Sequence, residues 1–407
     1  MDESTDDSRP FLEGMPEQGM LFASSDLGAA HDYRMQQQRA FGADDLSRWR
    51  SLSSQVPDLM KFLQRQFRGF PLEGVEAEII DNLSLPVGPF DEPLLHAGID
   101  DDRQQIERAA IELGYSLHSG VSAGVLHGPG MDAMQQRVML THASVLLVNI
   151  HLNTALHRLA KLLARSTPVD TAGKALWEYA NIRDTIKADQ ALQTDWTHFF
   201  MDYSLDSAQP GIGRAIPVSG LHQMCLLGDF SEAMSWFVMG HEFGHHILQH
   251  TLDGEASADG ESAEVTQGKE VEADVVGARL SAYLGEHNLR GLNYMAKTNI
   301  GAVLVLTTLD CFKRGRHLML TGTQDGFRKD DAHPPLQKRL QSVLSATCGS
   351  YPDADPERIA WFNTLRDQQK IAHDVIELIW RKSSPLLKKA FDDGMRGKTK
   401  LDTGWLP

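Results

Sequence analysis

The sequence of 407 residues has little cysteine and a deficit of positive charge, and both shortages exclude classes of protein. Its three cysteines, Cys225, Cys311 and Cys348, are far apart and odd in number. They therefore predict neither a disulfide framework nor a cysteine-ligated zinc site, and they fit a reducing compartment. The formal net charge of -16 argues against binding nucleic acid or an anionic membrane through bulk charge.

Long hydrophobic runs are also lacking. The longest strongly apolar stretch covers residues 300–309, whereas a membrane-spanning helix needs roughly 20 apolar residues. The acidic segment 1–7 has neither the basic nor the apolar part of a secretory signal peptide. We therefore expect a cytoplasmic protein without a transmembrane segment, and the hydrophobic content of 42% is enough for a sizeable core.

Composition and hydrophobic pattern divide the chain into four parts. We predict a disordered acidic N-terminus over residues 1–44 and a helical region over residues 45–210. The functional core is expected over residues 211–350, followed by C-terminal helices and a tail over residues 351–407. The role of the helical N-terminal half does not follow from its sequence.

Three segments outside the functional motifs have predicted structures. The glycine-rich segment 120–130 is predicted to be a loop, without the Lys-Ser/Thr ending of a phosphate-binding loop. Residues 131–166 are predicted to form one long helix. Residues 214–219 are the best candidate for a strand beside the functional site, where an extended substrate peptide could pair with it.

The strongest functional signal is an H-E-x-x-H pattern formed by His241, Glu242 and His245. It lies in an apolar stretch that we predict to be a buried helix over residues 229–250. Two histidines four residues apart lie on one face of a helix, so both imidazoles can bind one metal ion. The glutamate between them can act as general base toward water held by a zinc ion. A chance match is the alternative, so a third ligand is required.

Two more histidines follow the pattern. On a continuing helix, His246 and His250 lie roughly 140° and 180° from His241, so we expect neither to bind the same ion. They are themselves four residues apart and could form a second metal site. A pair that is hydrogen-bonded or exposed is the alternative.

The third ligand is expected in an acidic segment that starts the next predicted helix. Glu270 and Asp274 are four residues apart and share one face, whereas Glu272 points away from them toward solvent. We predict Glu270 as the third zinc ligand and Asp274 as the acceptor that fixes the tautomer of a ligand histidine. An exposed acidic helix start, favoured by the helix dipole, is the alternative.

These two motifs and the downstream segment from His333 to Arg339 resemble the gluzincin signature of the CAAX prenyl protease and HtpX family. The resemblance covers residues 230–345 and implies a zincin-like metallopeptidase core with one zinc ion per chain. It also implies that His333 lies near the active site as an oxyanion or substrate contact, and that Arg339 braces the site through acidic groups. The soluble character and the short gap between His245 and Glu270 are more similar to compact cytoplasmic metallopeptidases, such as Lit-like phage-exclusion proteases.

Taken together, the sequence predicts a zinc metalloendopeptidase in a predominantly α-helical α+β fold, with a small sheet beside the zinc helix. Its partner would be a protein or peptide substrate, with no nucleic acid involved. One alternative is a zinc-bearing regulatory or binding protein without relevant turnover. Another is a helical interaction protein in which the H-E-x-x-H pattern arose by chance. The substrate and the oligomeric state do not follow from the sequence.

Overall fold

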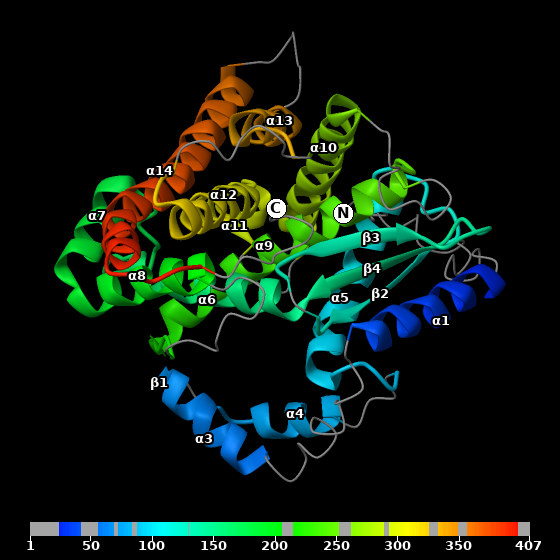
Figure 1. The fold of residues 1–407 in the computed structure, drawn as a ribbon, viewed down its shortest axis with the longest axis horizontal. Coiled ribbons are helices and arrows are strands. Elements are labelled where there is room, and N and C mark those ends of the chain that lie inside the picture. Colours follow the sequence, from blue (N-terminus) through cyan, green and yellow to red (C-terminus); the bar gives the residue numbers. More distant parts are fainter. Residues whose placement is uncertain are drawn as a thin grey trace, which may run out of the picture.

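The computed structural model describes residues 24–41, 56–68, 72–83, 88–128, 130–205, 215–251, 262–288, 293–324, 333–348 and 356–397. These residues form a mostly helical fold with one small sheet, so the predicted predominantly α-helical α+β class is confirmed (Figure 1). Within these ranges, no helix is both long and apolar enough to cross a bilayer.

Three strands form the sheet, namely β2 (Val121–Leu126), β3 (Ala133–Arg137) and β4 (Ser144–Asn149), in the order β2-β4-β3. β2 is parallel to β4, whereas β3 is antiparallel to it. β3 is therefore an edge strand, and no other strand of the described chain pairs with its outer edge. A separate two-residue pairing joins β1 (Phe67–Arg68) to β5 (Val218–Ser219) in parallel.

The prediction of one helix over residues 131–166 is wrong, because the segment forms β3, β4 and helix α6 (Ile150–Ser166). Every residue of β4 is buried, and its side chains alternate between two hydrophobic clusters on opposite faces of the sheet. A strand covered on both faces is apolar throughout, so its sequence lacks the alternation that distinguishes a strand from a buried helix. The alternating residues are Val145 and Leu147 on one face, and Leu146 and Val148 on the other.

The glycine-rich segment 120–130 contains strand β2 instead of the predicted loop. Its Gly124 permits a close approach by Arg34 of helix α1 (Ser24–Ala40), since a Cβ atom there would lie 2.4 Å from Nη1 of Arg34. Arg34 is buried and donates hydrogen bonds to Asp91 and to the hydroxyl of Ser122 in β2. A strand glycine that serves packing in this way resembles a loop glycine in sequence.

Helix α1 also corrects the predicted disorder of residues 1–44, because residues 24–40 are helical and pack on the sheet (Figure 1). The helix contributes few apolar side chains, such as Ala30, and its polar residues Arg34 and Gln38 are buried in hydrogen bonds. Composition alone indicates disorder here, because a helix held by buried polar residues lacks the apolar side chains that mark a packed helix in a sequence. Residues 1–23 and 42–44 lie outside the described residues.

The sheet lies toward one side of the molecule, with α1 beside it, and most of the other helices lie on the opposite side (Figure 1). One main hydrophobic core extends along the chain from Ile99 to Leu387, so residues on both sides of the predicted boundary at residue 210 share it. The aromatic residues Trp196, Phe199 and Phe200 lie deep inside this core. The remaining helices are α3 (Val56–Gln66), α4 (Val75–Leu83), α5 (Pro93–Glu112), α7 (Tyr179–Ala188), α8 (Gln190–Leu205), α9 (Gly220–Ile247), α10 (Ala263–His287), α11 (Tyr294–Lys297), α12 (Ile300–Thr321), α13 (Leu336–Cys348) and α14 (Pro356–Asp392).

Helices α9 and α10 contact each other through residues with little or no side chain. A Cβ atom on Gly244 of α9 would lie 2.9 Å from Cα of Ala273 in α10. One on Gly277 of α10 would lie 2.7 Å from the backbone nitrogen of His241, and one on Gly240 would lie 3.1 Å from Cα of Gly277. The backbones of the two helices therefore lie almost in contact at the turn that carries His241.

Replacing Gly277 by alanine should lower the free energy of unfolding by about 1–3 kcal/mol, since the new methyl group has no room against the α9 backbone. Gly268→Ala is the matched control on the same helix, because no atom lies within 4 Å of its Cβ position. Alanine should stabilise that position by roughly 0.5–1 kcal/mol. Urea unfolding of the metal-free variants measures both changes, and a Gly277→Ala protein as stable as wild type would contradict the packing argument.

Candidate metal centre

Helix α9 carries the H-E-x-x-H pattern, but its ends differ from the prediction. It begins at Gly220, earlier than the expected start at residue 229, and ends at Ile247, before the expected end at residue 250. Helix α10 begins at Ala263, so Glu270 lies in its second turn instead of at its start. The carboxylate of Glu270 is only 14% exposed, so the alternative of an exposed acidic helix start does not apply to it.

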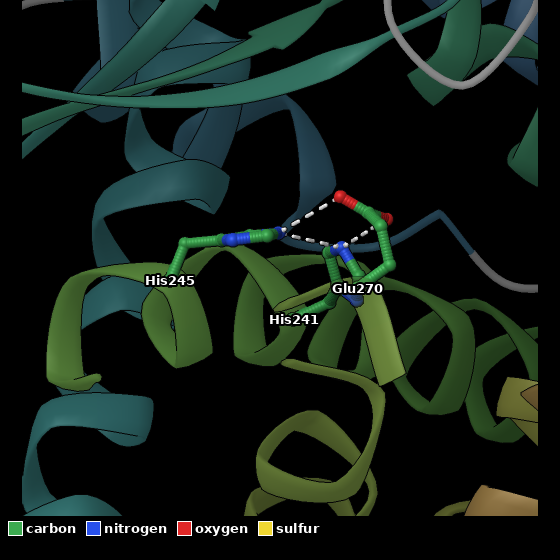
Figure 2. Close-up of side chains that lie close together, drawn as sticks. All are labelled: His241, His245 and Glu270. Carbon is green, nitrogen blue, oxygen red and sulfur yellow. Dashed lines mark hydrogen bonds and ion pairs between the residues drawn. The ribbon is translucent and has the colours of Figure 1, made fainter. Parts of the chain in front are cut away.

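His241, His245 and Glu270 are brought together by the contact of these two helices (Figure 2). The Nε2 atoms of the two histidines are 3.2 Å apart. Carboxylate oxygens of Glu270 lie 3.5 Å from Nε2 of His241 and 3.4 Å from Nε2 of His245. In the described part of the chain, no other group of three or more His, Cys, Asp or Glu residues is arranged to hold a metal ion.

The spacing of these three groups is compatible with a shared metal ion, because one ligand atom from each lies within 4.8 Å of the others. Zinc bonds of about 2.0–2.1 Å to nitrogen and oxygen place two ligand atoms of a tetrahedron roughly 3.3–3.4 Å apart. The two Nε2 atoms are 3.2 Å apart, close to that value. Nε2 of His241 lies 3.5 Å from Oε2 of Glu270, and Nε2 of His245 lies 3.4 Å from the other oxygen, Oε1, so both histidines face the same carboxylate but not the same oxygen. Two imidazoles and one carboxylate form a donor set of catalytic zinc sites, which leaves the fourth position to water or substrate.

A buried ion pair orients the first histidine. Nδ1 of His241 lies 3.0 Å from Oδ1 of Asp274, and Arg339 donates to both oxygens of the same carboxylate at 2.7 Å. Asp274 and Arg339 are fully or almost fully buried, and the contact is bidentate. With one proton held on Nδ1 by Asp274, His241 turns Nε2 toward Glu270 and His245, and in the neutral ring the lone pair of Nε2 is free to bind a metal ion.

Two of the other predicted site residues, His333 and Arg339, lie near the carboxylate of Glu270. Nε2 of His333 is 3.7 Å and Nη2 of Arg339 is 3.8 Å from Oε2 of Glu270, although both residues are far from Glu270 in sequence. Glu242 is buried, with 3% of its surface exposed. Burial lowers the pKa of Arg339, but Asp274, Glu270 and Glu242 outweigh that effect and raise it, so the guanidinium stays charged.

The buried charges strongly affect the ionisation of this group. Burial raises the pKa of Glu270, yet its contacts with His241 and His245 hold that pKa well below its ordinary value. Burial lowers the pKa of His241, but the hydrogen bonds to Asp274 and Glu270 outweigh it and raise this pKa to about 9. Without a metal ion, His241 therefore holds a second proton at neutral pH, in the position that a divalent cation would take.

His246 and His250 do not form the second metal site considered from the sequence. Nδ1 of His246 contacts the hydroxyl of Ser144 in β4 at 2.7 Å, and Nε2 contacts the backbone oxygen of Leu117 at 2.8 Å. Burial lowers the pKa of His246 to about 4, so it is neutral and links α9 to the sheet. His250 instead contacts His245, a neighbour that the helical projection misses because α9 ends before residue 250.

The strand predicted beside the site lies elsewhere. β5 directly precedes α9, and the 22 residues from Gly220 to His241 span roughly 33 Å at about 1.5 Å per residue. The strand near the metal centre is β3, which packs against α9. Just after that helix, the hydroxyl of Thr251 donates to Gln135 of β3 at 2.7 Å.

Comparison with known proteins gives no further guidance. No family model matches the chain, and no curated protein or solved structure is significantly similar to it. The resemblance to the CAAX prenyl protease and HtpX family therefore rests on the motifs alone, and the functional roles of the site residues stay predictions.

Zinc affinity should depend steeply on pH, because the metal must displace a proton from His241. With a pKa of about 9, the affinity should rise about tenfold per pH unit between pH 7 and pH 9 and then level off. The same proton stabilises the metal-free fold below pH 6.5, and that contribution is lost as the pH rises through about 9. Competition with a chelating dye at a series of pH values measures the slope, and a flat profile from pH 7 to pH 9 would contradict this assignment.

Proposed function

We propose that the protein is a zinc-dependent endopeptidase that hydrolyses peptide bonds of a protein substrate. The proposal rests on the convergence of two imidazole nitrogens and one carboxylate, a donor set of catalytic zinc sites, with one ligand atom from each within 4.8 Å of the others. His241, His245 and Glu270 would hold one zinc ion per chain. A zinc ion bound there would lower the pKa of a water molecule and polarise a peptide carbonyl.

The buried side chains around the donors have separate roles in the proposed reaction. Glu242, directly after the first ligand, accepts the proton of the attacking water on its carboxylate and delivers it to the leaving amine. Asp274 and Arg339 keep His241 in one tautomer. His333, which lies at the same carboxylate as Arg339, donates a hydrogen bond to the oxyanion.

The edge strand β3 is the proposed binding site for the peptide substrate. Its outer edge is unpaired by any strand within the described ranges, and the strand packs against the helix that carries the two histidines. An extended peptide can add to such an edge through backbone hydrogen bonds. β3 therefore takes the place of residues 214–219 in the proposed mode of peptide capture.

Two alternatives make different predictions. A zinc-bearing regulatory or binding protein would contain the metal but show no hydrolysis that depends on Glu242. A helical interaction protein with a chance motif would contain no stoichiometric zinc, and the spacing of the three donors argues against it. A cytoplasmic location is a further part of the proposal, since the scattered cysteines fit a reducing compartment.

Glu242→Gln should lower peptide hydrolysis by about 10²- to 10⁴-fold, the usual contribution of a general base, while zinc content stays unchanged. Turnover of a fluorogenic peptide library by the zinc-loaded protein measures the effect. Glu264→Gln, an exposed residue in the first turn of α10, is the control and should have wild-type activity. Equal turnover by the Glu242→Gln and wild-type proteins would exclude this mechanism, and zinc binding without any turnover would favour a regulatory protein.

A further inference from the structure

The second histidine of the metal centre has a neighbour on the side away from the donors. Nδ1 of His245 lies 3.0 Å from Nδ1 of His250, and Nε2 of His250 lies 3.0 Å from Oε2 of Glu272. The side chain of His250 is 7% exposed, whereas that of Glu272 is 65% exposed. A continuous chain of contacts thus leads from the surface of α10 through His250 to His245.

The end of α9 explains why His250 reaches His245. Gln249 has a φ of 55°, in the left-handed region, and the chain turns back after it. The backbone N–H of His250 donates to the carbonyl of His245 at 3.0 Å, and that of Gln249 donates to the carbonyl of His246 at 3.2 Å. These two hydrogen bonds define a Schellman motif, in which the side chains of the residues equivalent to His245 and His250 commonly touch. Here that contact is a T-shaped pair of imidazoles with centroids 5.1 Å apart.

The hydrogen-bonding roles in this chain follow from the metal centre. A histidine that offers the lone pair of Nε2 to a metal carries its proton on Nδ1. His245 therefore donates from Nδ1 to Nδ1 of His250, which then carries its own proton on Nε2 and donates it to Glu272. Both contacts have one donor and one acceptor, and no alternative tautomer of His250 satisfies them together.

We propose that His250 and Glu272 are positioning residues that hold His245 in its metal-binding tautomer and orientation. Asp274 does the same for His241 through one direct contact, so each histidine of the centre has its own carboxylate. The inference rests on the metal-binding part of the proposed function and is independent of the reaction catalysed.

Lys269 holds the turn itself in place. Nζ of Lys269 donates to the backbone carbonyl of His250 at 3.0 Å, and Lys269 directly precedes the third ligand Glu270. Two contacts therefore join the turn after α9 to the part of α10 around Glu270, one through a backbone carbonyl and one through Glu272. The same stretch of α10 thus carries the ligand Glu270 and holds the turn that brings His250 to His245.

The zinc dissociation constant of the full-length protein, measured by competition with a chelating dye, tests the inference. His250→Ala should weaken zinc binding about 10- to 100-fold, and Glu272→Ala should weaken it less, since water can replace an exposed carboxylate. His250→Gln should restore part of the affinity because its side-chain oxygen can accept from Nδ1 of His245. His287→Ala, an exposed histidine at the far end of α10, is the matched control and should bind zinc like wild type.

The double variant His250→Ala/Glu272→Ala distinguishes a positioning role of these residues from a general loss of charge or of the fold. If Glu272 acts only through His250, the double variant should bind zinc no more weakly than His250→Ala alone. The visible absorption of the Co²⁺-substituted protein should change in His250→Ala but not in His287→Ala. Should His250→Ala be unfolded, Glu272→Ala alone still tests the chain, because its side chain is exposed.

The possible outcomes separate this inference from the proposed function. Wild-type zinc affinity in both His250→Ala and Glu272→Ala, or strictly additive losses in the double variant, would overturn the positioning role and leave the metal centre intact. No zinc uptake by the wild-type protein would overturn the metal centre and the positioning role together. Zinc binding that depends on His250 without any peptide hydrolysis would support the positioning role and refute the peptidase.

Discussion

The close contact between helices α9 and α10 is the constraint on which the metal centre depends. Glycine or alanine at positions 240, 244, 273 and 277 lets the two backbones approach until an added Cβ atom would overlap the opposite helix. At that separation, side chains as short as glutamate and aspartate on α10 reach the imidazoles of α9 directly. A wider spacing would leave Asp274 buried without its histidine and Glu270 too far from His241 and His245.

This contact also concentrates charge in a largely buried region. Asp274 and Glu270 carry two negative charges, and Arg339 alone cannot balance them together with the buried Glu242. The protein compensates without a metal by holding an extra proton on His241, whose pKa lies at about 9. A divalent cation would supply the missing positive charge between the same three side chains, and this is the physical reason to expect one there.

The three residues of the candidate metal centre can be predicted from the sequence because their signal is local. A single helix is enough to place His241 and His245 on one face, with Glu242 between them in sequence. A second helix is enough to place two acidic residues four positions apart, Glu270 and Asp274, on one face. The surrounding fold is harder to predict from the sequence, since a strand buried on both faces, such as β4, has the same apolar pattern as a buried helix. The contact of His250 with His245 depends on the exact end of α9, which a projection on a continuous helix cannot give.

The metal content of the purified protein tests the central claim most directly. Elemental analysis would be made on wild type and on Glu270→Ala, both purified without added metal. The account predicts about one zinc ion per wild-type chain, lost or much reduced in the variant because only the two histidines remain. No zinc in the wild-type protein, and none taken up when zinc is added, would contradict the metal centre and with it the proposed peptidase.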